Sequence, residues 1–303
     1  MNNEETQSAP ALQTWKLTIA YDGTNFHGWQ VQPGKATVQG VLQAALGRVT
    51  GEAPLPQGSG RTDAGVHALG QVASFTLAAP IPAANLHRAL NRTLPPSVRI
   101  LQAETMPDSF HARHSARAKT YEYRIFRDEI CPPFLSRYAL ACPWPLDVEA
   151  LREAARAFLG EHNFLSFAAT DPDLTTRTLE RDEELAREGT MLPPPTVTGA
   201  MRTIYASIWE ERHTEDGELL VYRVRGSGFL HHMVRNLVGT MLEVGRGRVR
   251  PDEMAQILAA CSRTAAGATA PAQGLILHSV EYEKPGPVRS AEEGQNLDPK
   301  CTT

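Results

Sequence analysis

The sequence predicts an α+β fold in which two similar halves share a largely antiparallel central sheet flanked by helices. Three observations predict it. The 303 residues are 42% hydrophobic and 21% charged, which excludes disordered, collagen-like and coiled-coil classes. Segments with strand and helix periodicity are mixed, without the strict strand–helix alternation of a doubly wound parallel sheet. The order of elements in the first half recurs in the second, although the sequence itself does not repeat.

The first half begins with a strand at 15–21, where the side chains alternate in polarity. A helix follows at 38–49, because its apolar residues recur at helical spacing and share one face. An apolar strand at 71–77, a helix at 82–92 and a strand at 98–105 complete this half.

The second half begins with a strand at 120–126 and a helix at 147–159, each with the matching periodicity. The remaining elements are strands at 202–212 and 218–225, helices at 229–243 and 252–260, and a last strand at 274–282.

These elements divide the chain into an N-terminal domain at 14–112 and a C-terminal domain at 113–284. The polar ends, 1–13 and 285–303, are expected to be flexible tails. Residues 171–200 hold seven acids and three arginines, so this one segment accounts for the net charge of −4. It lacks periodicity and is expected to be a solvated acidic insertion.

The cellular setting is indicated by what the sequence lacks. The four cysteines form no C-x-x-C pair, which argues against a disulfide framework or a cysteine zinc site and favours a reducing cytoplasm. No apolar run approaches the roughly 18 residues of a membrane span, and the first residues do not resemble a secretion signal. We therefore expect a cytoplasmic protein with no membrane association.

Basic charge is concentrated in two places despite the acidic total. Residues 111–124 carry a net charge of +3, and residues 223–250 carry +5. A polyanion meets such local patches rather than the average charge, so nucleic acid is a candidate partner.

The glycine-rich segment GSGRTDAGVHA, at 58–68, places Arg61 and Asp63 on a loop between a helix and a strand. A guanidinium close to Asp63 favours the ionised carboxylate, which then serves as a nucleophile or a base. The alternative is a turn that Asp63 merely caps. No Gly-Lys-Ser/Thr follows, so the segment is not a nucleotide-binding P-loop.

Basic and aromatic residues alternate in FHARHSARAKTYEYRI, at 110–125, as on a surface that binds single-stranded nucleic acid. Tyr121 and Tyr123 share one face of the predicted strand, and Glu122 and Arg124 share the other. The simpler interpretation is that both tyrosines belong to the core.

The helix predicted at 229–243 is strongly apolar, which makes Arg235 unusual. A buried arginine is costly unless it pairs with a carboxylate or a phosphate; the alternative is an arginine that faces solvent. His231 and His232 should point in different directions on a helix and are therefore poor joint metal ligands.

The chain resembles the TruA family of tRNA pseudouridine synthases. GRTDAGVHA matches the signature of that family. Other blocks match in order from about residue 15 to residue 282: YDGTNFHGWQVQ, FHARHSARAKTYEYRI, GEHNFLSFAA, RTIY, GSGFLHHMVRNLVG and APAQGLIL.

The resemblance implies a pseudouridine synthase fold and an isomerase that converts uridine to pseudouridine at positions 38, 39 and 40 of the tRNA anticodon stem-loop. It implies a homodimer that works without a cofactor. Isomerisation exchanges one bond of C1′ for another within the same nucleotide, so we expect that no metal is required. By motif position Asp63 is the nucleophile, Tyr121 stacks on the target base and Arg235 pairs with Asp63. Arg61 contacts RNA and helps to hold the site, and Leu275 packs against the uracil.

Phosphate binding is expected to fall on basic residues of the same blocks and of the helix at 82–92. They are Arg88, Arg92, Arg113, Lys119 and Arg225, together with Arg61.

Two other functions fit the residues. A non-catalytic RNA-binding module would use the same basic strands and would be indifferent to Asp63. A hydrolase of glycosidic bonds would need a second carboxylate placed as an acid.

Overall fold

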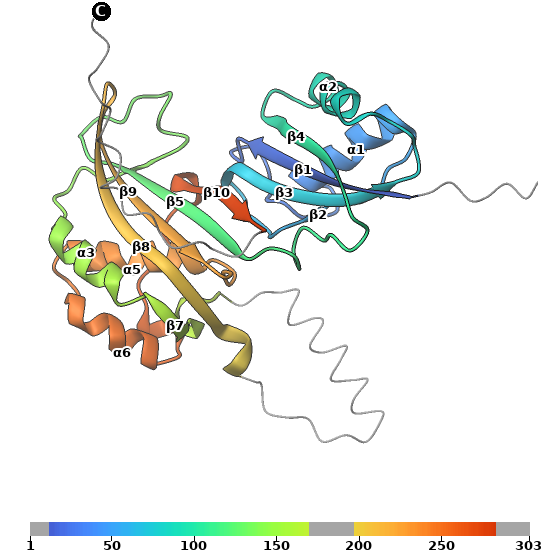
Figure 1. Cartoon of the computed structure of the whole chain (residues 1–303). Coiled ribbons are helices and arrows are strands. Elements are labelled where there is room, and N and C mark those ends of the chain that lie inside the picture. The colour runs from blue at the N-terminus through green and yellow to red at the C-terminus, as the bar shows by residue number, and fades with distance from the viewer. Residues whose placement is uncertain (1–11, 170–196, 283–303) are drawn as a thin grey trace, which may run out of the picture.

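One sheet of ten strands runs through the whole molecule (Figure 1). The computed structural model describes residues 12–169 and 197–282. The expected tails, apart from their edges at 12–13, and most of the acidic insertion lie outside these residues. The strand order is β4-β1-β3-β10-β5-β9-β8-β7, with β2 paired to β3 and β6 paired to β5 at the side of this path.

The N-terminal half is built on β1 (Gln13–Tyr21), which pairs antiparallel with both β3 (His67–Leu77) and β4 (Val98–Met106). The short β2 (Gln57–Gly58) extends this sheet beside β3. Two helices, α1 (Val38–Thr50) and α2 (Ala83–Thr93), pack on this half.

Local signals explain the bounds of α1. The Thr37 side chain accepts a hydrogen bond from the Gly40 N–H and caps the first turn. Gly51 ends the helix with φ of 79°, a left-handed conformation that glycine adopts without strain.

The C-terminal half is an antiparallel series of β5 (Ala118–Phe126), β9 (Gly217–Gly226), β8 (Met201–Thr214) and β7 (Gly160–Asn163). The remaining elements of this half are β6 (Leu140–Ala141), α3 (Val148–Arg156), α5 (Met233–Gly245) and α6 (Met254–Ala259). The three helices cover one face of these strands (Figure 1).

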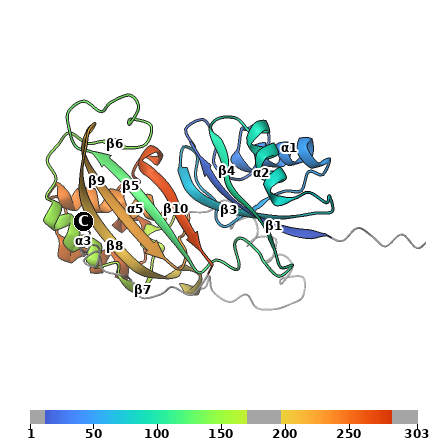
Figure 2. The same ribbon diagram turned by 45° about the horizontal axis from the view of Figure 1, so that its top comes forward.

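The last strand, β10 (Leu275–Glu281), lies in the centre of the sheet and joins the two halves (Figure 2). It pairs parallel with β3, where Ile276 is opposite His67, and antiparallel with β5, where Leu277 is opposite Tyr121. The segments that precede β3 and β10 are therefore brought to the same part of the molecule.

The two faces of β5 meet different surroundings. Tyr121, Tyr123 and Ile125 are buried in the main apolar core, which contains residues of both halves. On the opposite face, the Glu122 carboxylate is 2% exposed and accepts hydrogen bonds from Arg124, Arg212 and Arg223. The expected division of the two faces is thus confirmed.

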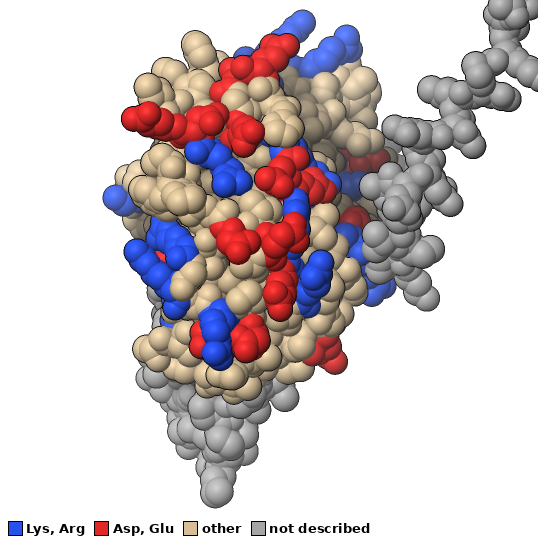
Figure 3. Space-filling view, turned by 90° about the vertical axis from the view of Figure 1, so that its left-hand side faces the viewer, with Lys and Arg blue, Asp and Glu red and all other residues tan. Residues whose placement is uncertain are grey.

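Acids and bases are intermixed on the outer side of the C-terminal half, the left-hand side of Figure 1 (Figure 3). Arg152 pairs with Glu211, and Arg212 pairs with Glu210. Because these arginines are neutralised locally, this side offers no uniform basic surface to a polyanion.

The structure confirms the α+β class and every helix and strand that the sequence predicts, with shifts of a few residues at their ends. The main error is the start of α5, which begins at Met233 rather than at Phe229. His232 adopts a left-handed backbone with φ of 57°, so residues 229–232 cannot form the first turn. The short strands β2, β6 and β7 were not predicted. No helix in the described ranges is long and apolar enough to cross a membrane.

Candidate active site

Asp63 lies on the loop between β2 and β3, and the segment that follows β1 holds this loop in place. The Trp29 N–H donates to the Thr62 carbonyl at 3.0 Å, and the Gly65 N–H donates to the Phe26 carbonyl at 3.3 Å. The Tyr21 hydroxyl lies 2.8 Å from the Thr62 hydroxyl. The backbone on both sides of Asp63 is therefore fixed.

Gly28 allows the two segments to approach this closely. Its φ is +86°, and a Cβ atom at this position would lie 2.7 Å from the Thr62 carbonyl oxygen. Gly65, with φ of +78°, makes the turn directly after Asp63. The expected loop position of Asp63 is confirmed. Position 28 requires glycine, because the backbone there contacts the Asp63 loop.

Arg235 pairs with Asp63 from the first turn of α5. Its Nη1 donates to Oδ2 of Asp63 at 3.0 Å, and its Nε donates to the Ala270 carbonyl at 2.7 Å. The two side chains are 15% and 16% exposed, so solvent screens the pair only in part. Of the two interpretations of Arg235, the one with a carboxylate partner is confirmed.

The Ala270 contact depends on a close approach between α5 and the segment before β10. A Cβ atom at Gly239 would lie 1.7 Å from the Ala268 carbonyl oxygen, so only glycine fits there. The Ala270 N–H in turn donates to the Arg235 carbonyl at 3.1 Å. Backbone contacts with Ala270 thus hold Arg235 in position independently of Asp63.

His231 and His232 also face Asp63, an arrangement that the helical pattern of the sequence does not predict. Their Nε2 atoms lie 3.5 Å from Oδ1 and 3.4 Å from Oδ2 of Asp63, and their ring centroids are 4.0 Å apart. The prediction that the two rings diverge was wrong, because both residues precede α5 and His232 has a left-handed backbone.

The surroundings favour a neutral ring at His232. Burial lowers the pKa of His232, Asp63 opposes this effect, and His231 and Arg235 add to it. Nδ1 of His231 is buried without a hydrogen-bond partner among the described residues. A buried N–H without an acceptor is costly, which favours the tautomer with its proton on Nε2, the atom that faces Asp63.

The three side chains offer ligand atoms within 4.8 Å of one another, a spacing at which they could meet on one metal ion. The Arg235 guanidinium on the same carboxylate opposes a second cation there. That the reaction requires no metal stays a prediction.

Tyr121 lies on β5 with its side chain buried, 7% exposed. Its ring meets Phe229 edge-on, with centroids 5.0 Å apart and planes at 79°. Burial raises the pKa of its hydroxyl, and the nearby Tyr21 and Asp63 raise it further. The hydroxyl is therefore neutral at physiological pH and lies within the electrostatic range of Asp63.

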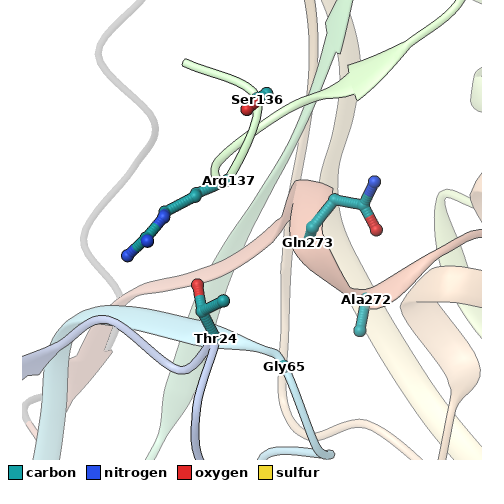
Figure 4. Close-up of a pocket in the computed structure, with 6 residues that line it drawn as sticks. All are labelled: Thr24, Gly65, Ser136, Arg137, Ala272 and Gln273. Atoms are coloured by element: carbon teal, nitrogen blue, oxygen red, sulfur yellow. The ribbon is translucent and has the colours of Figure 1, made fainter. Parts of the chain in front are cut away.

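Leu275 begins β10 and is 5% exposed. It pairs with Tyr123, which lies two residues after Tyr121 on β5 and on the same face of that strand. Its predecessors Ala272 and Gln273 line a cleft of about 340 Å³, together with Gly65, two residues after Asp63 (Figure 4). The other residues that line the cleft are Thr24, Ser136 and Arg137.

The expected RNA contacts are distributed over several elements. Arg61 is exposed on the Asp63 loop, and Arg88 is exposed on α2, where it donates to Asn85 of the same helix. Lys119 lies at the start of β5, and Arg113 is exposed on the segment that precedes it. Arg225 is engaged by a two-bond ion pair with Glu281 at 2.8 and 2.7 Å.

At the centre of the site, the largely buried carboxylate of Asp63 contacts the fixed positive charge of Arg235. An aromatic ring and apolar side chains lie on the strands beside it. A carboxylate held in this way is suited to act as a nucleophile or a base on a flat apolar group that enters next to the ring.

Comparison with known proteins gives consistent results. A family model described as tRNA pseudouridine synthase matches residues 17–115 and 193–283. A tRNA pseudouridine synthase A of Solibacter usitatus is 49% identical over 267 residues, which are 88% of this chain and 98% of that protein.

Proteins of the same name from two other bacteria are similarly close. The one from Brevibacillus brevis is 43% identical, over 89% of this chain and 100% of its own length. The one from Maridesulfovibrio salexigens is 40% identical, over 96% of this chain and 98% of its own length. The chain therefore belongs to the tRNA pseudouridine synthase family.

Proposed function

We propose that this protein isomerises uridine to pseudouridine at positions 38, 39 and 40 of the tRNA anticodon stem-loop, with Asp63 as the nucleophile on a flipped-out uridine. Its relatives, named tRNA pseudouridine synthase A, support an isomerase that acts on uridine in tRNA. The observation that carries the role of Asp63 is its ion pair with Arg235.

The reaction needs little besides one reactive carboxylate. The bond between C1′ and N1 breaks, the uracil rotates, a bond forms between C1′ and C5, the proton on C5 leaves, and N1 takes up a proton. Asp63 would attack C1′ or C6 of the uridine, or would assist formation of a glycal-like intermediate. Each route needs an ionised carboxylate, and the Arg235 guanidinium lies 3.0 Å from the Asp63 carboxylate in a partly desolvated site, where it can stabilise negative charge.

Tyr121 and Leu275 would hold the uracil. A base inside a stem cannot reach Asp63, so the nucleotide must flip out at a cost of a few kcal/mol. Stacking on an aromatic ring contributes about 1 to 3 kcal/mol and would offset part of that cost. The position of Tyr121, buried on β5 within electrostatic range of Asp63, supports this role.

Binding of the rest of the tRNA would involve phosphate contacts from Arg61, Arg88, Arg113 and Lys119. Such contacts are weakened by salt, so we expect affinity to fall steeply with ionic strength. We expect a homodimer that acts on cytoplasmic tRNA without a cofactor. Light scattering of the purified protein measures its mass and so tests the dimer.

The experiment for the proposed specificity uses unmodified tRNA transcripts that carry uridine at only one of the three positions. Pseudouridine is located by carbodiimide derivatisation and primer extension. We expect product at 38, 39 and 40 and at no other uridine. Product at another site alone would contradict the proposed specificity, and no product from protein that binds tRNA would favour a non-catalytic module.

A further inference from the structure

Three basic side chains converge beside the Asp63 loop from separate elements. Lys119 begins β5, Arg113 lies on the segment between β4 and β5, and Arg202 is the second residue of β8. Strand pairing explains the convergence: Lys119 and Ile204 are both opposite Gly226 of β9, and Arg202 is two residues before Ile204. The Ala112 N–H donates to the Ser74 hydroxyl at 3.0 Å, which fixes the segment of Arg113 against β3.

Lys119 connects this cluster to the Asp63 loop. Its Nζ donates to the Ser59 carbonyl at 2.6 Å, and a Cβ atom at Gly60 would lie 3.0 Å from Nζ. The bond to Ser59 uses one of the three donors of the ammonium group. Because side chains alternate along a strand, Lys119 is on the same face of β5 as Tyr121, two residues further on.

No acid compensates these charges within 12–169 and 197–282: none of the three side chains forms an ion pair with an Asp or Glu there. Neighbouring arginines differ in this respect, since Arg225 pairs with Glu281 and Arg223 pairs with Glu122. Burial together with the charges of Arg113 and Arg202 lowers the pKa of Lys119 to about 8. The cluster is therefore electrostatically unfavourable until an anion enters it.

We propose that Lys119, Arg113 and Arg202 form a binding site for one backbone phosphate of the RNA, adjacent to the flipped uridine. The inference rests on the proposed function. It adds to the uridine site at Asp63 a neighbouring position that binds a phosphate. A base flips by rotation about its backbone, so a neighbouring phosphate held by fixed cations determines where the base enters. The bound phosphate relieves the mutual repulsion of the three side chains, which pair with no Asp or Glu in the part of the chain that the structure describes.

The first test compares Lys119→Gln and Arg202→Gln with wild type on an unmodified tRNA transcript. We expect kcat/KM to fall about tenfold to a hundredfold in each variant, the usual effect of losing a hydrogen bond to a charged group. Arg250→Gln is the matched control. Arg250 is 71% exposed, pairs with Asp252 and follows the C-terminal end of α5, so this variant should retain wild-type kcat/KM.

Thermal unfolding separates an anion site from a structural contact. If the three side chains serve to bind a phosphate, Lys119→Gln removes one of three charges that repel one another. The Tm of this variant should then be unchanged or higher than that of wild type. A lower Tm together with unchanged kcat/KM would show that the contact with Ser59 is structural and would overturn the proposal.

The second test locates the phosphate. Anticodon stem-loop RNAs are made with one uncharged methylphosphonate linkage, on either the 5′ or the 3′ side of the target uridine. One of these substitutions should lower kcat/KM of wild type about tenfold or more, and it should have no further effect on Lys119→Gln. Equal losses in wild type and variant, or no loss at either linkage, would overturn the proposal.

The unsubstituted RNA separates the two proposals. Formation of pseudouridine in it by wild type supports the proposed function, whatever the effect of the linkages. Absence of pseudouridine from it would contradict the proposed function itself.

Discussion

The guanidinium of Arg235 lies 3.0 Å from the carboxylate of Asp63, although 172 positions separate the two residues in the sequence. The contact joins the two halves of the molecule, because Asp63 precedes β3 in the first half and Arg235 is in α5 of the second. The central position of β10 between β3 and β5 brings these elements together.

Loss of this contact should affect turnover more than folding. Arg235→Ala leaves Asp63 partly buried without its cation, and the truncation of one partner in such a pair costs about 2 to 5 kcal/mol. We therefore expect kcat/KM to fall about 30-fold to several thousand-fold. Arg235→Lys keeps the charge but loses the hydrogen bond from Nε to the Ala270 carbonyl, so the fall in kcat/KM should be smaller. Wild-type turnover of Arg235→Ala would contradict the role of the pair.

Two substitutions of Tyr121 test the roles of its ring and of its hydroxyl separately. Tyr121→Phe keeps the ring, which meets Phe229 and which we propose stacks on the uracil, so KM should stay close to wild type. It loses any proton transfer by the hydroxyl, so kcat should fall. Tyr121→Ala should in addition weaken binding by about 1 to 3 kcal/mol. If the single-turnover rate constant of Tyr121→Phe equals that of wild type, the hydroxyl has no essential role in the reaction.

Gly28 should control the position of Asp63. Gly28→Ala places a Cβ atom 2.7 Å from the Thr62 carbonyl, so the Asp63 loop must shift. A displacement of about 1 Å costs about a hundredfold in rate. Gly34→Ala is the control, because Gly34 also has a positive φ, of +68°, but no atom lies within 4 Å of its Cβ position. Equal kcat/KM in the two variants would contradict the role of Gly28.

Glu122 should determine stability in acid. Burial alone would raise its pKa, but hydrogen bonds from Arg223 and Arg124 and the charge of Arg212 lower it to about 2. The unfolded chain binds this proton near pH 4.5, so the contribution of Glu122 is present above that pH and is lost as the pH falls towards 2. Urea unfolding of wild type from pH 5 to pH 2.5 should show this decrease.

The variant Glu122→Gln leaves three arginines around a buried neutral group. We expect it to lose about 3 to 5 kcal/mol of unfolding free energy at pH 7 and most of the pH dependence below 5. Glu210→Gln, at a 35% exposed carboxylate, should lose no more than about 1 kcal/mol. Similar losses in the two variants would contradict the importance of burial.

The sequence predicts this fold well because its strands and helices have regular periodicity and clear ends, as in α1 with Thr37 and Gly51. It also predicts the loop of Asp63, since glycines in GSGRTDAG require a turn. The need of Arg235 for an anion follows from its apolar neighbours, but its partner follows from the family resemblance and from the fold.

Contacts between distant segments could not be predicted from periodicity. The pattern of 229–243 is helical throughout, and only the left-handed backbone at His232 shows that the helix starts later and that both histidines face Asp63. The partial burial of Lys119 likewise depends on the position of Ser59, 60 residues away. A tight approach of two backbones, as at Gly239 and Ala268, has no local sequence signal.

The most direct test of the account measures tritium release from unmodified tRNA labelled at uridine C5, with wild type, Asp63→Ala and Asp63→Asn. Bond formation between C1′ and C5 expels this hydrogen, so release reports the isomerisation itself. We predict release by wild type alone, while both variants fold and bind the same tRNA. Release by a folded Asp63 variant at a rate near wild type would contradict the assignment of Asp63 as the nucleophile.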